Sequence, residues 1–184
     1  MRQAAINDVT LQKKFDALFN AKGWVKNYRT AFPLLLVAAK NGHPHAQNLV
    51  GYCYNLGFSP HRSSSAAVAW YKKAARKGYS EAMYNLAVCY AEGRGAPRND
   101  QKAFKLNQRA AAAGHAWATC NLGTMYADGI GTKADPVLAV KCWRKVTGKR
   151  RQRCGGWQRL VCRHNKCREI AISQVTLALE NRLR

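Results

Sequence analysis

Small and apolar residues recur along this chain with the spacing of one helix face, and the whole pattern returns after 36 residues. In "SEAMYNLAVCYAEG", which begins at Ser80, four of them (Ala82, Leu86, Ala87 and Tyr90) fall at i, i+4, i+5 and i+8, on one side of an α-helix. The same stretch returns from Ala116 as "AWATCNLGTMYADG". An earlier copy keeps the register with these residues: Ala46, Val50, Gly51, Tyr54 and Gly57. The pattern therefore predicts the same amphipathic helix, here termed helix A, three times over.

A second segment recurs between these copies with the same offset. It reads "AVAWYKKAARKG" from Ala67, "AFKLNQRAAAAG" from Ala103 and "AVKCWRKV" from Ala139, and "AFPLLLVAAKNG" from Ala31 fits the same register. This segment predicts a second short helix, helix B, in each unit. Neither helix is large enough to bury its own apolar face, so neighbouring units must stack and cover each other.

Glycines and polar residues mark where these helices are expected to end and begin. A glycine follows each B helix and each A helix, at Gly42, Gly78 and Gly114 and at Gly57, Gly93 and Gly129. Glycine commonly ends a helix because it adopts the left-handed conformation without a Cβ penalty. Ser64 and Asp100 stand where a B helix needs its N-cap, and Asp135, before Pro136, has this role in the last one.

These positions resemble the Sel-one-like repeat family, a relative of the tetratricopeptide repeat with the pattern A-x-x-x-L-G-x-x-Y-x-x-G-x-G, a loop, and A-x-x-W-[YF]-x-x-A-A-x-x-G. The resemblance runs from about Ala31 to Lys145. The best A helix has Ala82, Leu86, Tyr90, Gly93 and Gly95, and the best B helix has Ala67, Trp70, Tyr71, Ala74, Ala75 and Gly78. The expected fold is all-α, a right-handed α-α superhelix of about three 36-residue helix-turn-helix repeats with capping segments.

Two sites depart from the family pattern. The first copy has Gly57-Phe58-Ser59 where the family has Gly-x-Gly, and the second B helix has Leu106 and Asn107 in place of an aromatic pair. We expect looser packing or a bend in the stack at these sites.

Three regions follow from the limits of the repeat. Residues 1–30 are expected to form an N-terminal capping helix, because "DVTLQKKFDALFN" at 8–20 places its leucines and phenylalanines on one face. Residues 31–146 form the repeat solenoid, and residues 147–184 form a basic, cysteine-containing and divergent C-terminal tail.

The tail has two competing interpretations. It carries ten Lys and Arg against two Asp and Glu, with four potential metal ligands in between: Cys154, Cys162, His164 and Cys167. One interpretation is a basic arm around Trp157 that binds nucleic acid, or a small zinc site, although the ligand spacing matches no established zinc pattern. The other, which we favour, is a diverged or truncated end that only covers the last helix.

Composition indicates a folded protein with a strong attraction to polyanions. Of the 184 residues 47% are apolar, and 31 Lys and Arg against 9 Asp and Glu give a formal net charge of +22. The seven cysteines do not pair within the repeat, so reduced thiols are expected. No apolar run has the length of a signal peptide or a membrane span, so we expect a cytoplasmic protein without membrane contact, or export by a route that the sequence does not show.

No catalytic constellation emerges from the sequence. The nine acidic residues and five histidines are scattered, and Cys53 and Cys89 fall on the interior of helix A. Gly93-Arg94-Gly95 follows a helix rather than a strand and recurs with the repeat, unlike a phosphate-binding loop. We therefore expect no enzyme activity, no cofactor and no metal.

The family resemblance implies a protein-protein interaction scaffold, whose curved groove of helices receives an unidentified partner protein. The A-helix residues off the packing face are the candidate protein-binding groove: Asn48, Tyr84, Asn85 and Asn121. A structural role for Asn85 and Asn121, hydrogen-bonding to a neighbouring turn, is the simpler alternative for these two. The alternative function is non-specific nucleic-acid binding through the basic tail.

Overall fold

The computed structural model describes residues 17, 25 and 27–147 of the chain. Seven helices make up most of this part: α2 (Tyr28–Lys40), α3 (Pro44–Leu56), α4 (Ser64–Arg76), α5 (Ser80–Glu92), α6 (Asp100–Ala112), α7 (Ala116–Asp128) and α8 (Pro136–Thr147). The A helices are α3, α5 and α7, and the B helices are α2, α4, α6 and α8. Apart from residue 17, the expected capping helix at 8–20 lies outside the described residues, as does the tail after Thr147.

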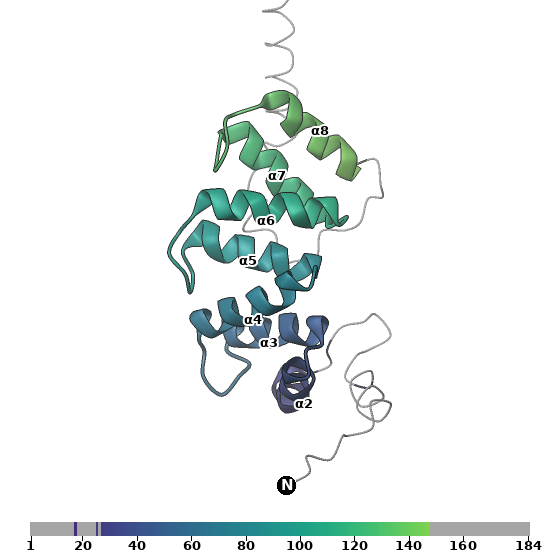
Figure 1. The fold of residues 1–184 in the computed structure, drawn as a ribbon, viewed down its shortest axis with the longest axis vertical. Helices are drawn as coiled ribbons and strands as arrows, with labels where there is room; N and C mark the ends of the chain where they lie inside the picture. The colour runs from purple at the N-terminus through teal and green to yellow at the C-terminus, as the bar shows by residue number, and fades with distance from the viewer. Residues whose placement is uncertain (1–16, 18–24, 26, 148–184) are drawn as a thin grey trace, which may run out of the picture.

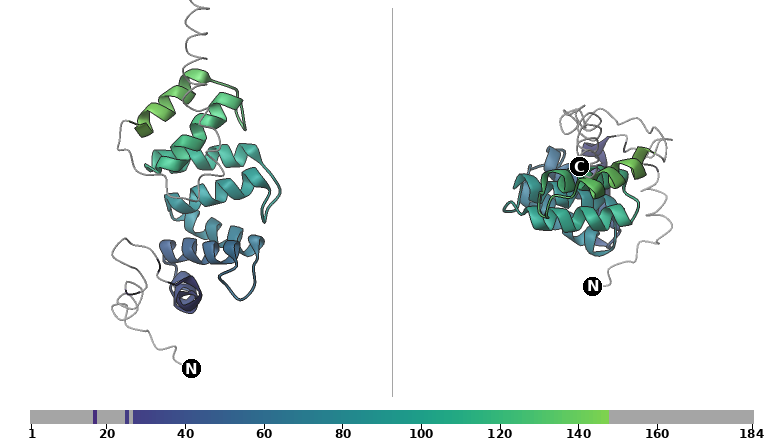
Figure 2. Two further views of the ribbon diagram at one scale, coloured as in Figure 1. Left: turned by 180° about the vertical axis from the view of Figure 1, so that it is seen from behind. Right: turned by 90° about the horizontal axis from the view of Figure 1, so that it is seen from above.

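The helices form one elongated stack in chain order (Figures 1 and 2). The closest pairs are α3 with α4, α5 with α6 and α7 with α8, which are the A and B helices of one repeat. Contacts of α4 with α5 and of α6 with α7 join each repeat to the next, and α2 packs on α3. The prediction of an all-α helical repeat solenoid is confirmed.

Small residues let the helices approach closely in the core. Ala46, Ala82 and Ala118, which share one position of the repeat, have no exposed surface. Tyrosines further along the A helices pack on the B helices: Tyr54 and Tyr126 lie edge-on to Phe32 and Phe104, with ring centroids 5.5 and 5.3 Å apart. The core is thus a repeated combination of alanine and aromatic rings.

The B helices begin at a polar cap that the sequence analysis placed one residue too late. The N-caps are Ser63 and Asn99, whose side chains accept hydrogen bonds from Ala66 N (3.2 Å) and Lys102 N (2.8 Å). Ser64 and Asp100 are the first helical residues instead. An N-cap has an extended backbone, so it must precede the helical residues. Asp135 caps α8 as predicted, accepting from Leu138 N at 2.9 Å.

The second glycine of each Gly-x-Gly loop is a packing residue. A Cβ on Gly95 would lie 2.1 Å from the carbonyl oxygen of Ser64, and one on Gly131 would lie 2.2 Å from that of Asp100. The loop after each A helix therefore touches the start of the B helix of the preceding repeat. In the first repeat Ser59 takes this place, and it is buried and donates to His61 O at 2.7 Å.

The expected looseness at this first loop is not observed, because aromatic rings pack there. Phe58 stacks on Tyr28 of α2 with ring centroids 5.2 Å apart and an interplanar angle of 9°. Tyr52 lies beside both rings, at 5.3 Å from Tyr28 and 6.4 Å from Phe58. The loss of a glycine is thus accompanied by a local aromatic cluster.

The other departure, at Asn107, is matched by a change on the facing A helix. Gly51 lies against the ring of Tyr71, and Gly123 against the ring of Trp143, where an added Cβ would come within 2.7 and 2.4 Å of ring atoms. In the middle repeat the same two positions hold Ala87 and Asn107. A smaller side chain on helix B therefore coincides with a larger one on helix A.

Candidate protein-interaction face

The N-terminal ends of the A helices carry the side chains that connect one repeat to the next. His43, Tyr79 and His115 are the N-caps of α3, α5 and α7, at the same repeat position. The Nδ1 atoms of His43 and His115 accept hydrogen bonds from Ala46 N (3.4 Å) and Ala118 N (3.1 Å), whereas Tyr79 makes no side-chain cap bond. His43 and His115 thus each cap the N-terminus of the helix that follows them.

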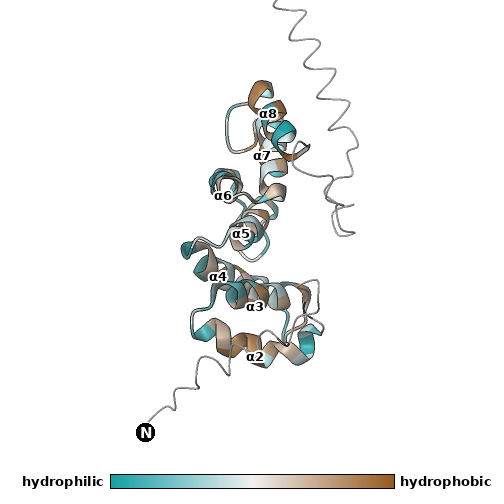
Figure 3. Cartoon of the chain, turned by 90° about the vertical axis from the view of Figure 1, so that its right-hand side faces the viewer, coloured by the Kyte–Doolittle hydropathy of each residue, from teal (hydrophilic) through white to brown (hydrophobic). Residues whose placement is uncertain are grey.

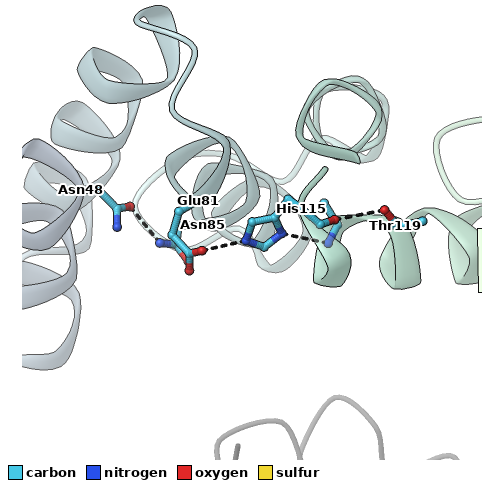
Figure 4. A network of polar contacts seen from close by, with 6 residues as sticks. Asn48, Glu81, Asn85, His115 and Thr119 are labelled. Carbon is cyan, nitrogen blue, oxygen red and sulfur yellow. Dashed lines mark hydrogen bonds and ion pairs between the residues drawn. The ribbon is translucent and has the colours of Figure 1, made fainter. Parts of the chain in front are cut away.

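His115 also joins α7 to α5 (Figure 4). Its Nε2 lies 2.7 Å from Oε2 of Glu81, and its ring stacks on Tyr84 with centroids 4.8 Å apart. Because Nδ1 accepts from a backbone N–H, the ring proton is on Nε2, which donates to the carboxylate. One imidazole therefore caps its own helix and binds two side chains of the preceding A helix.

The same contact occurs one repeat earlier with different residues. His45, at the repeat position of Glu81, lies beside Tyr79, the N-cap of the next A helix, with ring centroids 5.7 Å apart. Burial, and then the nearby His43, lower the pKa of His45, which favours its neutral form. The repeat therefore uses an aromatic pair at one junction and a carboxylate-imidazole pair at the next.

An amide pair connects α3 to α5 further along these helices. Nδ2 of Asn85 donates to Oδ1 of Asn48 at 3.0 Å (Figure 4). Asn48 is only 5% exposed, whereas Asn85 is half-buried. The partner of Asn85 is thus a side chain on the adjacent A helix, and not the neighbouring turn that the simpler alternative expected.

The structure brings three of the four candidate residues close to these contacts. Asn48 and Asn85 bond to each other, and Tyr84 stacks on His115. Asn121 lies half-buried on α7, at the repeat position of Asn85. We call the surface around these contacts the A-helix face, formed by Glu81, Tyr84, Asn85, His115 and Asn121. Asn48 was predicted to lie in the groove but is buried, and it supports the face through its bond to Asn85.

Comparison with known proteins identifies the repeat. The family model described as Sel1 repeat matches residues 44–79, 80–115 and 118–145. The chain belongs to the Sel1 repeat family. The matched segments each begin near the start of an A helix and include the following B helix.

Two solved structures resemble the chain in both sequence and fold. A Sel1 repeat protein from Oxalobacter formigenes is 31% identical with a TM-score of 0.64, over 76% of this chain and 53% of its own length. A protective antigen of uropathogenic Escherichia coli strains, which displays an SLR fold, is 26% identical with a TM-score of 0.68. This chain covers 30% of the antigen, and the match includes 76% of this chain.

The sequence prediction of this face left out Glu81 and His115, although the register of the Sel1 repeat contains a signal for His115. His43 and His115 stand at the same position, immediately before an A helix, where a side-chain acceptor caps the helix. The bond between His115 and Glu81 of the preceding repeat joins residues 34 positions apart, so the 36-residue register alone does not align these two partners.

Two cysteines inside the Sel1 repeats, Cys53 and Cys89, are packing residues. Cys53 and Cys89 are 0% and 2% exposed, and burial raises their thiol pKa values to about 12 and about 11. Such thiols remain protonated at neutral pH and are poor nucleophiles. The described residues contain no group of three or more His, Cys, Asp or Glu that could hold a metal ion. The tail ligands considered above lie outside the described residues.

No helix in the described part of the chain is both long and apolar enough to cross a membrane.

Removal of the His115 side chain tests the structural part of this face. We expect His115→Ala to lower the free energy of unfolding by about 1–2 kcal/mol, because α7 loses its N-cap acceptor. His115→Asn keeps a capping oxygen and should lose less than half of that. Urea unfolding followed by circular dichroism measures both values, and equal losses in the two variants would show that capping is not the cause.

Proposed function

We propose that this chain is a non-enzymatic protein-interaction scaffold and that its A-helix face receives a partner protein. Proteins of the Sel1 repeat family are generally interaction scaffolds. The observation that supports this surface is the set of contacts between consecutive A helices, in which Asn48 bonds to Asn85 and Glu81 to His115. These contacts fix the relative positions of three A helices before any partner binds, which reduces the entropy cost of binding.

The composition of this face suits a protein partner. It combines amide and carboxylate groups with half-buried aromatic rings, and aromatic residues are enriched at protein interfaces. Tyr84 of α5 and the imidazole of His115, which stacks on it, are such rings. The partner's identity and the cytoplasmic location expected from the sequence stay predictions.

A charge placed on the A-helix face should prevent partner binding without affecting the fold. We expect Asn121→Arg to lose the proteins that the wild-type chain retains from nuclease-treated extract of its own cells at 0.15 M salt. Gln101→Arg, on the exposed side of α6, adds the same charge elsewhere and should retain them. Quantitative mass spectrometry of the retained proteins gives the comparison, with melting curves to confirm that both variants fold. Retention of the same proteins by all three chains would contradict the proposed surface.

A further inference from the structure

The outward sides of the B helices carry a dense group of positive charges. Seven exposed side chains form it, and we call them the basic ridge: Lys72, Lys73, Lys105, Arg109, Lys141, Arg144 and Lys145. They stand opposite the buried face of each B helix, which in α4 includes Ala67, Tyr71 and Ala74. Stretches of α4 and α6 have the colour of hydrophilic residues in Figure 3.

The repeat places these charges in register. Lys73, Arg109 and Lys145 share one repeat position, and Lys105 and Lys141 share the position one helical turn earlier. The charged position therefore returns on three successive B helices, and the ridge follows the stack from α4 to α8. A row of this kind is suited to a ligand that is itself a line of regularly spaced charges.

Few negative charges oppose this row. The helices α4 and α8 contain no acidic residue, and α6 contains only Asp100, at its first position. Asp100 is already bonded to Arg98, with two side-chain contacts of 3.0 Å. The ridge is thus left with an excess of positive charge, in a chain whose formal net charge is +22.

The ridge has few exposed apolar anchors for other anionic partners, and the half-buried ring of Trp70 beside it lies under the ammonium of Lys73, 4.0 Å from the ring centroid. Among the residues that the structure describes, the exposed large hydrophobic side chains are Val37 and Val137, and only Val137 is near the ridge, one turn before Lys141. Stable protein interfaces need buried aromatic or aliphatic anchors, and insertion into a membrane needs an apolar face. A phosphodiester backbone needs only cations, because release of its counterions supplies the affinity.

We propose that the basic ridge binds nucleic acid through the phosphate backbone, without reading the base sequence. This role is separate from the proposed scaffold function, because it uses the B helices and not the A-helix face. It also differs from the alternative function considered in the sequence analysis, because the binding surface lies on the folded stack and not in residues 147–184. The tail adds further positive charge but is not required for the row of charges on α4, α6 and α8.

The test compares two double variants of the full chain that lose the same charge at different places. Lys105→Glu with Lys141→Glu changes the ridge, and Arg29→Glu with Lys133→Glu changes exposed cations outside it. The probe is a fluorescein-labelled 20-nucleotide oligothymidylate, whose anisotropy is titrated at several salt concentrations. We expect the ridge variant to bind at least tenfold more weakly at 0.1 M salt, with a shallower salt dependence. The control variant should weaken by less than threefold.

Three outcomes would overturn the proposal. Equal weakening of both variants would show a response to net charge alone, and undiminished binding by the ridge variant would place the site elsewhere in the chain. Poly-L-glutamate of matched length, or vesicles containing phosphatidylserine, serve as competing probes. Tighter binding of either one than of the oligonucleotide, with loss in the ridge variant, would assign the ridge to an acidic protein or a membrane instead. Circular dichroism melts confirm that each variant is folded.

Discussion

Gly95→Ala is expected to lower the free energy of unfolding by more than about 3 kcal/mol, because strain in the backbone and a clash with another backbone segment add together. Gly95 has a φ of +73°, which costs an alanine about 1–2 kcal/mol. In addition, the new Cβ would lie 2.1 Å from the carbonyl oxygen of Ser64, which belongs to the first turn of α4. The atoms that this Cβ would meet belong to the backbone of α4, which cannot rotate away as a side chain can. The loop that contains Gly95 must therefore move away from α4.

Gly78→Ala is the matched control for this effect. Gly78 has a similar φ of +83°, but nothing lies within 4 Å of the position that its Cβ would take. We expect this variant to lose only about 1 kcal/mol, from backbone strain alone. Urea unfolding curves of both variants and the wild type give the two values. Equal losses would show that the contact between the loop and the B helix adds nothing to stability.

This contact explains why the Gly-x-Gly loop recurs after the A helices. The first glycine, Gly93, ends α5 in the left-handed conformation, and the second, Gly95, allows the loop to touch the preceding repeat. The loop thus fixes the spacing between units. Gly-x-Gly also occurs in nucleotide-binding loops, but here the two glycines are required for the repeats to stack. The loop of this chain follows a helix, whereas a nucleotide-binding loop follows a strand.

The helices and their pairing were predictable because each position of the repeat occurs at least three times in the sequence. Ala46, Ala82 and Ala118 were expected in the core from their spacing, and all are fully buried. The B-helix caps were misplaced by one residue because Ser63 and Ser64, and likewise Asn99 and Asp100, are adjacent residues that can all cap a helix. Only the backbone conformation decides between two such neighbours.

The candidate face was harder to predict because its contacts cross between repeats. Helical spacing placed Asn48 off the packing face, but the bond to Asn85 and the cover of neighbouring helices leave it 5% exposed. Glu81 and His115 come together from different positions of consecutive repeats. A periodic pattern identifies residues that occupy the same position in each repeat. A contact between residues at two different positions also depends on how consecutive repeats are rotated against each other.

In each repeat, one residue of helix A faces one residue of helix B, and in the first and last repeats a large side chain on helix B is paired with a glycine on helix A. This pairing leads to a second large expected effect on the free energy of unfolding. Within a helix, replacing glycine by alanine normally stabilises by about 1 kcal/mol. Gly123→Ala should instead destabilise by about 1–2 kcal/mol, because the rigid indole of Trp143 occupies the space and overpacking costs more than the propensity gain. A Cβ at this position would lie 2.4 Å from Nε1 of that ring.

The sign of this effect should reverse when the ring is removed. In a Trp143→Asn background, Gly123→Ala reproduces the combination of Ala87 and Asn107 that the middle repeat already contains. There we expect alanine to stabilise by about 1 kcal/mol, which gives a coupling of about 2–3 kcal/mol between the two positions. The four chains of this cycle are compared by urea unfolding. Additive effects would mean that the two helices adjust their separation freely, whereas a reversal would show that each Sel1 repeat sets the distance between its helices by the combined size of one residue pair.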